Sequence, residues 1–154
     1  MQGYDLRQTI DSDKPVRQFA LFGLFGHEVN ITDGKHVFIK APRYKYPENL
    51  YNYTLTPMYM ASRFNEKDLE DADLAGPFSF TKGCKVLKIR PRKLLEKPFL
   101  EYEEMSDRLY DLEADPNQQC PVKDDRIIKE LSLNMKRLMM ENDAPQEAFA
   151  RLGL

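Results

Sequence analysis

The clearest periodic pattern in the chain lies in its last third. Between residues 123 and 142, apolar side chains recur at helical spacing and form one stripe, and charged side chains occupy the opposite face. The stripe consists of Ile127, Ile128, Leu131, Met135, Leu138 and Met139. Asp124 and Asp125 suit the positive N-terminal end of a helix. The pattern predicts an amphipathic helix that packs on a sheet of the same chain; a partner-binding face is the alternative.

Alternation of apolar and polar residues predicts strands upstream of this helix. The apolar run 19–25 is expected to form a buried strand. The Asp33-Gly34 pair predicts a tight hairpin turn before a strand over 36–40. Weaker signals predict a third strand over 53–61, a hairpin over 77–90, a short strand over 108–112 and a second short helix from about 145 to 152. Residues 66–70 are expected to form a short helix or a loop.

Strands followed by a helix predict an α+β fold, in which an antiparallel sheet of about four strands carries a C-terminal amphipathic helix. Residues 1–18 are polar, and Asp11, Asp13 and Pro15 are expected to interrupt any helix there. We therefore interpret residues 1–18 as a lead-in segment and residues 19–154 as the folded domain.

Composition narrows the classes of function. With 154 residues, 42% hydrophobic and 31% charged, the chain suits one globular core. The net charge of −2, with both signs interspersed, argues against nucleic-acid binding. Apolar runs are far shorter than the roughly 18 residues that span a bilayer, so no membrane association is expected. The first residues lack the pattern of a signal peptide, so we expect the chain as expressed to be cytoplasmic.

Residues that carry common catalytic chemistry are scarce. A catalytic serine needs a histidine base and an orienting acid, and the chain has only His27 and His36, with no G-x-S-x-G motif. Cys84 and Cys120 form no C-x-x-C pair and are interpreted as free thiols. No acidic cluster has the spacing of a metal-binding loop. We predict no catalytic residue and no metal site in the chain.

Four segments, taken in order, carry a resemblance to a known family. Residues 1–6, MQGYDL, look like the MQG-x-D/S-L segment that sulfatases carry after their α/β core. Residues 25–38, FGHEVNITDGKHVF, are similar to an FGxxVNxTDGxxxY hairpin of one branch of bacterial sulfatases. Residues 109–116, LYDLEADP, resemble the LYDLxxDP signature near sulfatase C-termini, and residues 144–154 are similar to a tail of the same branch. The chain thus resembles the C-terminal subdomain of a bacterial sulfatase, within the alkaline-phosphatase-like superfamily.

The resemblance implies a subdomain that supports catalysis performed elsewhere. In that family a Cys or Ser within C/S-x-P-x-R becomes the formylglycine nucleophile, and it works beside a calcium ion held by carboxylates in the N-terminal core. No Cys or Ser of this chain is followed by proline two places on. The resemblance therefore implies no cofactor in this chain, with calcium and formylglycine in the missing core. An isolated chain is expected to be inactive, because enzymes lower barriers by roughly 8–23 kcal/mol and the nucleophile and metal supply much of that.

Four residues are candidates for substrate binding. The resemblance implies that His27 and Asn30 lie in a hairpin that approaches the substrate cleft. Lys35 and Arg43 are cations that can attract an anionic sulfate ester, such as a sulfated carbohydrate. The alternatives are a structural role for His27 and surface charges for Lys35 and Arg43.

The expected partner is the N-terminal sulfatase core, which this subdomain would buttress while lining part of the cleft. Phe22, Leu24 and Phe25 are expected to be exposed without the core and to drive self-association. Two other functions stay open. One is the C-terminal part of a related phosphatase or phosphonate monoester hydrolase. The other is a stand-alone carbohydrate-binding or interaction module, for which Tyr44, Tyr46, Tyr51 and Tyr53 offer stacking surfaces.

Overall fold

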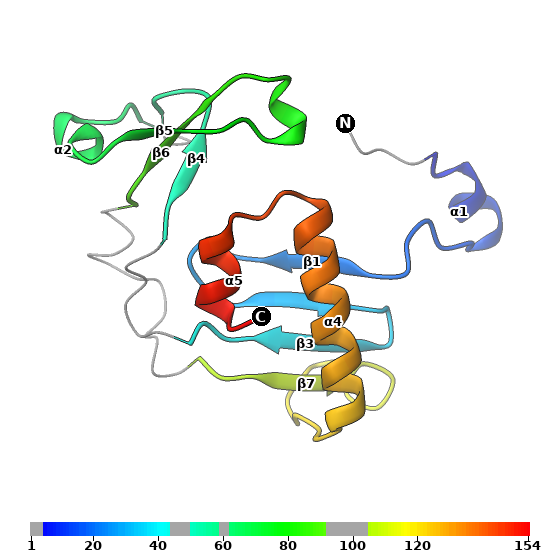
Figure 1. The fold of residues 1–154 in the computed structure, drawn as a ribbon. Helices are drawn as coiled ribbons and strands as arrows, with labels where there is room; N and C mark the ends of the chain where they lie inside the picture. Colours follow the sequence, from blue (N-terminus) through cyan, green and yellow to red (C-terminus); the bar gives the residue numbers. More distant parts are fainter. Residues whose placement is uncertain (1–4, 44–49, 59–61, 92–104) are drawn as a thin grey trace.

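The computed structural model describes residues 5–43, 50–58, 62–91 and 105–154 (Figure 1). The strands are β1 (Ala20–Gly23), β2 (Val29–Thr32), β3 (His36–Lys40), β4 (Asn52–Thr54), β5 (Asp73–Ala75), β6 (Val86–Ile89) and β7 (Arg108–Asp111). The helices are α1 (Arg7–Ser12), α2 (Glu66–Leu69), the 3-10 helix η1 (Ser79–Thr81), α4 (Asp125–Glu141) and α5 (Gln146–Leu152).

The larger sheet, which we call sheet A, has the order β1-β2-β3-β7, and every neighbouring pair is antiparallel. Helix α4 crosses one face of sheet A, and α5 lies beside it (Figure 1). The predicted α+β fold, with a four-stranded antiparallel sheet and a C-terminal amphipathic helix, is therefore confirmed. A second, three-stranded sheet, which we call sheet B, has the order β4-β6-β5 and was not expected.

The main core lies between sheet A and α4. Ile31, Phe38 and Leu109 come from three adjacent strands and are at most 1% exposed. They belong to one cluster with Leu131 and Met135 of the helix stripe. The stripe thus packs on the chain's own sheet, because alternate residues of each strand and every third or fourth residue of the helix face each other.

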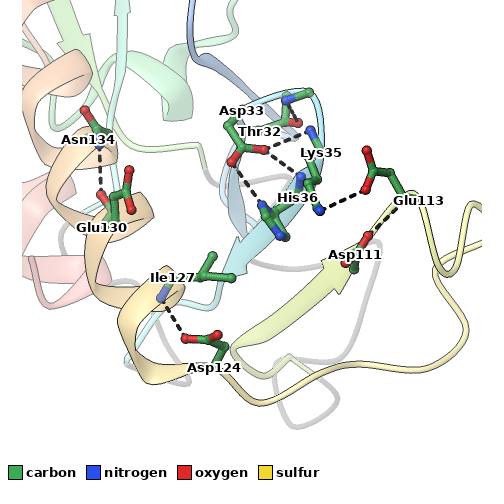
Figure 2. Close-up of polar contacts among 11 residues, drawn as sticks. Thr32, Asp33, Lys35, His36, Asp111, Glu113, Asp124, Ile127, Glu130 and Asn134 are labelled. Carbon is green, nitrogen blue, oxygen red and sulfur yellow. Dashed lines mark hydrogen bonds and ion pairs between the residues drawn. The ribbon is translucent and has the colours of Figure 1, made fainter.

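Two local signals fix this arrangement. Asp124 caps α4, since its carboxylate accepts hydrogen bonds from the backbone N–H groups of Arg126 and Ile127 (Figure 2). The turn between β2 and β3 is held by Asp33, whose Oδ1 accepts from the N–H groups of Lys35 and His36. Gly34 has φ +93°, a conformation that L side chains rarely adopt. The predicted helix and hairpin are both confirmed.

The apolar run 19–25 is not a buried strand, which corrects the prediction. Only 20–23 form a strand, and β1 lies at an edge of sheet A. Phe22, Leu24 and Phe25 are 48%, 65% and 48% exposed. The reason is that an edge strand has no neighbour on one side, which hydrophobicity along the chain does not reveal.

The predicted hairpin over 77–90 is also wrong. Residues 79–81 form η1, where the Thr81 hydroxyl donates toward the carbonyls of Phe78 and Cys84, and Lys82 is left-handed with φ 52°. Strand β6 pairs instead with β4 and β5, which come from earlier in the chain. The third strand predicted over 53–61 is limited to β4, and residues 59–61 lie outside the described part.

The lead-in segment contains a helix, contrary to the prediction. In α1, the Ser12 hydroxyl donates to the carbonyl of Gln8, and the helix ends at Asp13, which is left-handed with φ 54°. It has no buried residues and extends away from both sheets (Figure 1). Helix α2, one of two alternatives for residues 66–70, starts with a capping box between Asn65 and Asp68.

Candidate functional site

A groove of about 530 Å³ lies beside the edge strand β1 of sheet A. One wall is formed by β1 and the loop that follows it, including Phe22, Leu24 and Phe25. The other walls are residues 50–53 and the start of α5. Most of these side chains are apolar, so the groove suits a polypeptide surface or an apolar group more than a small anion.

Arg151 ties the loop between β1 and β2 to α5. It lies in the last turn of α5 and is 8% exposed. Its Nη1 donates to the carbonyl of His27 at 2.8 Å, and the carbonyl of Gly26 is 3.5 Å away. The Arg151 carbonyl accepts from the N–H of Arg43 at 2.7 Å. One buried arginine therefore links three segments, and a charged donor makes such bonds stronger than neutral ones.

Two of the predicted site residues, His27 and Arg43, meet around Arg151. His27 is 3% exposed, so its side chain is inside the protein and not on an open wall. Arg43 is exposed, and its side chain lies so close to Gly153 that any Cβ there would collide with it. Gly153 ends α5 in the left-handed conformation, with φ +68°. A substrate contact by either residue stays a prediction.

Lys35 is not brought together with Arg43 or His27. It follows β2, whereas His27 precedes β2, so the length of that strand separates them. Lys35 Nζ pairs with Glu113 Oε2 at 2.8 Å (Figure 2). The hydrogen bond that Lys35 donates to Glu113 is the main reason that the pKa of Lys35 is raised above its usual value. This geometry agrees with the alternative reading of Lys35 as a turn charge.

Asn30, the fourth predicted residue, has an unusual environment. It lies in register with Phe22 on one side and Ile39 on the other. Among the described residues, its buried Oδ1 has no hydrogen-bond partner, and neither does the buried Nε of Arg108. Arg108 also lies in register with Ile39, and its Nη2 donates to Glu28 Oε1 at 2.5 Å. Each buried polar group without a partner costs about 1–3 kcal/mol, and a bound water or a polar group of another molecule would remove that cost.

A polar joint connects α5 with sheet B. Glu147 of α5 accepts a hydrogen bond from the Tyr53 hydroxyl, and its Oε1 is 3.4 Å from Lys88 Nζ. The Tyr53 ring packs edge-on against Phe78, with centroids 5.3 Å apart. Lys88 Nζ also lies 4.0 Å from the centre of the Tyr51 ring. Two strands of sheet B are thereby fixed to a helix that covers sheet A.

Two residues of this polar joint, Glu147 and Tyr53, have pKa values that differ from their usual ones. Burial raises the pKa of Glu147, but the hydrogen bond from Tyr53 and the charge of Lys88 outweigh it, and the pKa ends below its usual value of 4.5. Burial, and then the bond to Glu147, raise the pKa of Tyr53 well above that of a free phenol. A carboxyl whose pKa is lowered by folding stabilises the fold above its unfolded pKa, and this contribution is lost as pH falls through the folded pKa.

We therefore expect the protein to lose stability in acid, in part because Glu147 becomes protonated. Thermal unfolding measured between pH 7 and pH 3 will show a larger loss of Tm, below about pH 4.5, for the natural chain than for Glu147→Gln. The other carboxyls titrate in both proteins, so the difference between the two curves isolates Glu147. Parallel curves would contradict the assigned role of this joint.

Other reactive groups do not assemble a catalytic site in the described part of the chain. His36 Nδ1 lies 3.0 Å from Asp33 Oδ2, but no hydroxyl or thiol of the described residues bonds to His36. Cys84 and Cys120 are exposed free thiols, as predicted. Residues 5–43, 50–58, 62–91 and 105–154 contain no group of three His, Cys, Asp or Glu side chains placed to hold a metal ion.

Comparison with known proteins adds no relative. No family model, no curated protein and no solved structure matches the chain. No helix in the described residues combines the length and apolar character needed to cross a membrane.

Proposed function

We propose that the chain is the C-terminal subdomain of a sulfatase-type ester hydrolase and that it supports a separate catalytic core. The observation that carries the proposal is the exposed apolar surface of Phe22, Leu24 and Phe25, which we call the apolar rim, beside the groove. An exposed apolar cluster beside a groove is a common mark of a site that binds another protein surface. The core of the hydrolase is the partner that we assign to it.

The positions of the sulfatase-like segments support the proposal. Residues 25–38 supply the loop beside the groove and the β2–β3 hairpin, and residues 109–116 begin in β7, which pairs with β3. The last segment forms α5, which reaches back to the same loop through Arg151. Segments that are far apart in sequence thus belong to sheet A and to the helix that contacts its β1–β2 loop.

The proposed division of labour assigns binding and positioning to this chain. Asn30, with its unbonded buried oxygen, is the residue that we expect to gain a hydrogen bond when the core is present. His27 and Arg43 are proposed to shape the cleft from inside the Arg151 network, and Lys35 is too far along β2 to join them. Calcium and formylglycine belong to the core in this proposal, as the sequence resemblance implies.

The test is complementation. We expect the chain alone not to hydrolyse 4-nitrophenyl sulfate, whereas mixing it with a sulfatase core that lacks its C-terminal subdomain gives a 1:1 complex and restores turnover. Leu24→Ser will weaken the complex by 10-fold or more, because burial of a leucine is worth about 1.5–3 kcal/mol. Binding is measured by calorimetry and turnover by absorbance.

Leu133→Ser is the matched control, since Leu133 lies on α4 away from the rim and is 61% exposed, against 65% for Leu24. Enzyme-like hydrolysis by the repurified chain alone would contradict the proposal, as would failure to bind any such core. Restored turnover of 4-nitrophenyl phosphate or a phosphonate ester, but not of the sulfate, would select the related phosphatase or phosphonate hydrolase instead.

The carbohydrate-module alternative is less well supported by the described tyrosines. Tyr53 is held by Glu147 and Phe78, and Lys88 occupies a face of Tyr51. Tyr44 and Tyr46 lie outside the described residues. Specific binding of the isolated chain to a glycan array would revive this alternative.

A further inference from the structure

The two edges of sheet A differ in how they are protected. On the β7 edge, the carbonyl of Leu109 accepts a hydrogen bond from the N–H of Val122 at 2.8 Å, so a following segment bridges that strand. On the other edge, β1 pairs with β2 along one side. No hydrogen bond from any other part of the described chain reaches residues 20–23 on the outer side of β1. Within the described part of the chain, the outer edge of β1 is therefore unpaired.

The open edge also lacks the residues that usually prevent strand pairing. Natural proteins protect such edges with charged residues, especially lysine, or with proline. Residues 18–26 read QFALFGLFG and contain neither a charge nor a proline. By contrast, β7 carries Arg108 at one end and Asp111 at the other. An uncharged edge strand flanked by the apolar rim is a template for another strand.

We infer that β1 pairs with β1 of a second copy of this chain in antiparallel orientation, forming a two-fold symmetric dimer with a continuous sheet across the interface. Residues 18–26 are uncharged in both copies, so two copies can pair without setting like charges against each other. Antiparallel pairing also keeps the two Arg17 side chains at opposite ends, whereas parallel pairing would set Arg17 beside Arg17. A two-fold axis also closes the assembly, because the same edge is used once by each copy.

The exposed area of the apolar rim indicates how stable the dimer can be. Aromatic side chains bury about 150–250 Å² each, so the roughly half-exposed rim offers on the order of 300 Å² per copy. A stable interface of standard size buries about 800 Å² per partner. The remaining buried surface has to come from backbone pairing and the groove walls. The dimer is therefore expected to be weak and to form only as the concentration rises. This inference concerns the chain alone and stands whether or not the proposed hydrolase function is correct.

Sedimentation equilibrium over a range of concentrations tests the dimer. We expect the average mass to rise from 18.1 kDa toward twice that value. Phe22→Lys and Leu24→Lys will each weaken association at least 10-fold, because a lysine at the edge must be desolvated there. Leu133→Lys, on the exposed face of α4, will change it less than about 2-fold. Circular dichroism checks that each variant is folded, and two rim variants guard against one failing to fold.

A second measurement locates the contact. With Cys84 and Cys120 replaced by serine, Phe22→Cys is expected to form a disulfide-linked dimer under mild oxidation, since facing residues of an antiparallel pair lie within disulfide reach. Leu133→Cys in the same background is expected to stay unlinked. A chain that remains monomeric at the highest soluble concentration overturns the inference. Association that Leu133→Lys weakens as much as Phe22→Lys, or larger aggregates that neither variant changes, overturn it as well.

Discussion

Replacing Phe38 with alanine is expected to lower the free energy of unfolding by about 3–5 kcal/mol, the usual cost of emptying a phenylalanine site in a packed core. Phe38 is 0% exposed at the centre of β3 and belongs to the cluster beneath α4. Because small domains are stable by only about 5–15 kcal/mol, this one change removes a large fraction of the total. Urea unfolding followed by circular dichroism measures it.

Phe22→Ala is the matched control, because it makes the same substitution in the same sheet at a side chain that is 48% exposed. We expect it to cost less than about 1 kcal/mol at concentrations low enough to keep the chain monomeric. Equal losses at the two positions would mean that the core does not lie between sheet A and α4, and would refute the assigned packing.

The second large effect is expected at Arg151. Truncation to alanine removes a charged donor from the buried carbonyl of His27, so we expect the free energy of unfolding to fall by about 2–4 kcal/mol. The loop between β1 and β2 will open before the rest of the protein, because Arg151 holds it to α5. Hydrogen exchange of the His27 N–H, which donates to the carbonyl of Leu24, reports that opening separately from global unfolding.

Two variants accompany this experiment. Arg151→Lys keeps the charge but loses the planar fork of donors. Its free energy of unfolding is therefore expected to lie between those of the natural chain and Arg151→Ala. Arg137→Ala removes an exposed arginine that pairs with Glu141 on α4, and it is expected to cost less than about 1 kcal/mol. If Arg151→Ala behaves like Arg137→Ala, Arg151 does not position the loop.

The elements that could be predicted from the sequence are those fixed by short-range signals. The Asp124 cap and the apolar stripe define α4 within one stretch of chain, and the Asp33-Gly34 turn forces β2 and β3 together. Sheet B was missed because its pairing is not local. Strand β6 joins segments from before and after α2, and nothing in residues 77–90 identifies those partners.

The candidate site could be predicted only in part, for the same reason. Arg151 and Glu147 act on loops and strands about a hundred residues away, and their sequence context is an ordinary short helix. The separation of Lys35 from His27 was predictable, because the hairpin turn already implied that they lie at opposite ends of β2. The burial of His27 was not, since it depends on contacts with the last turn of α5.

Helix α5 also has a consequence for biosynthesis. It supplies Phe149 and Leu152 to the main core, Arg151 to one loop and Glu147 to sheet B. A nascent chain on the ribosome lacks all of these contacts until residues 146–152 have been made, so α5 can join the two sheets only after that point of synthesis. A premature stop just before residue 146 would release a product that lacks α5 and is prone to aggregation and proteolysis.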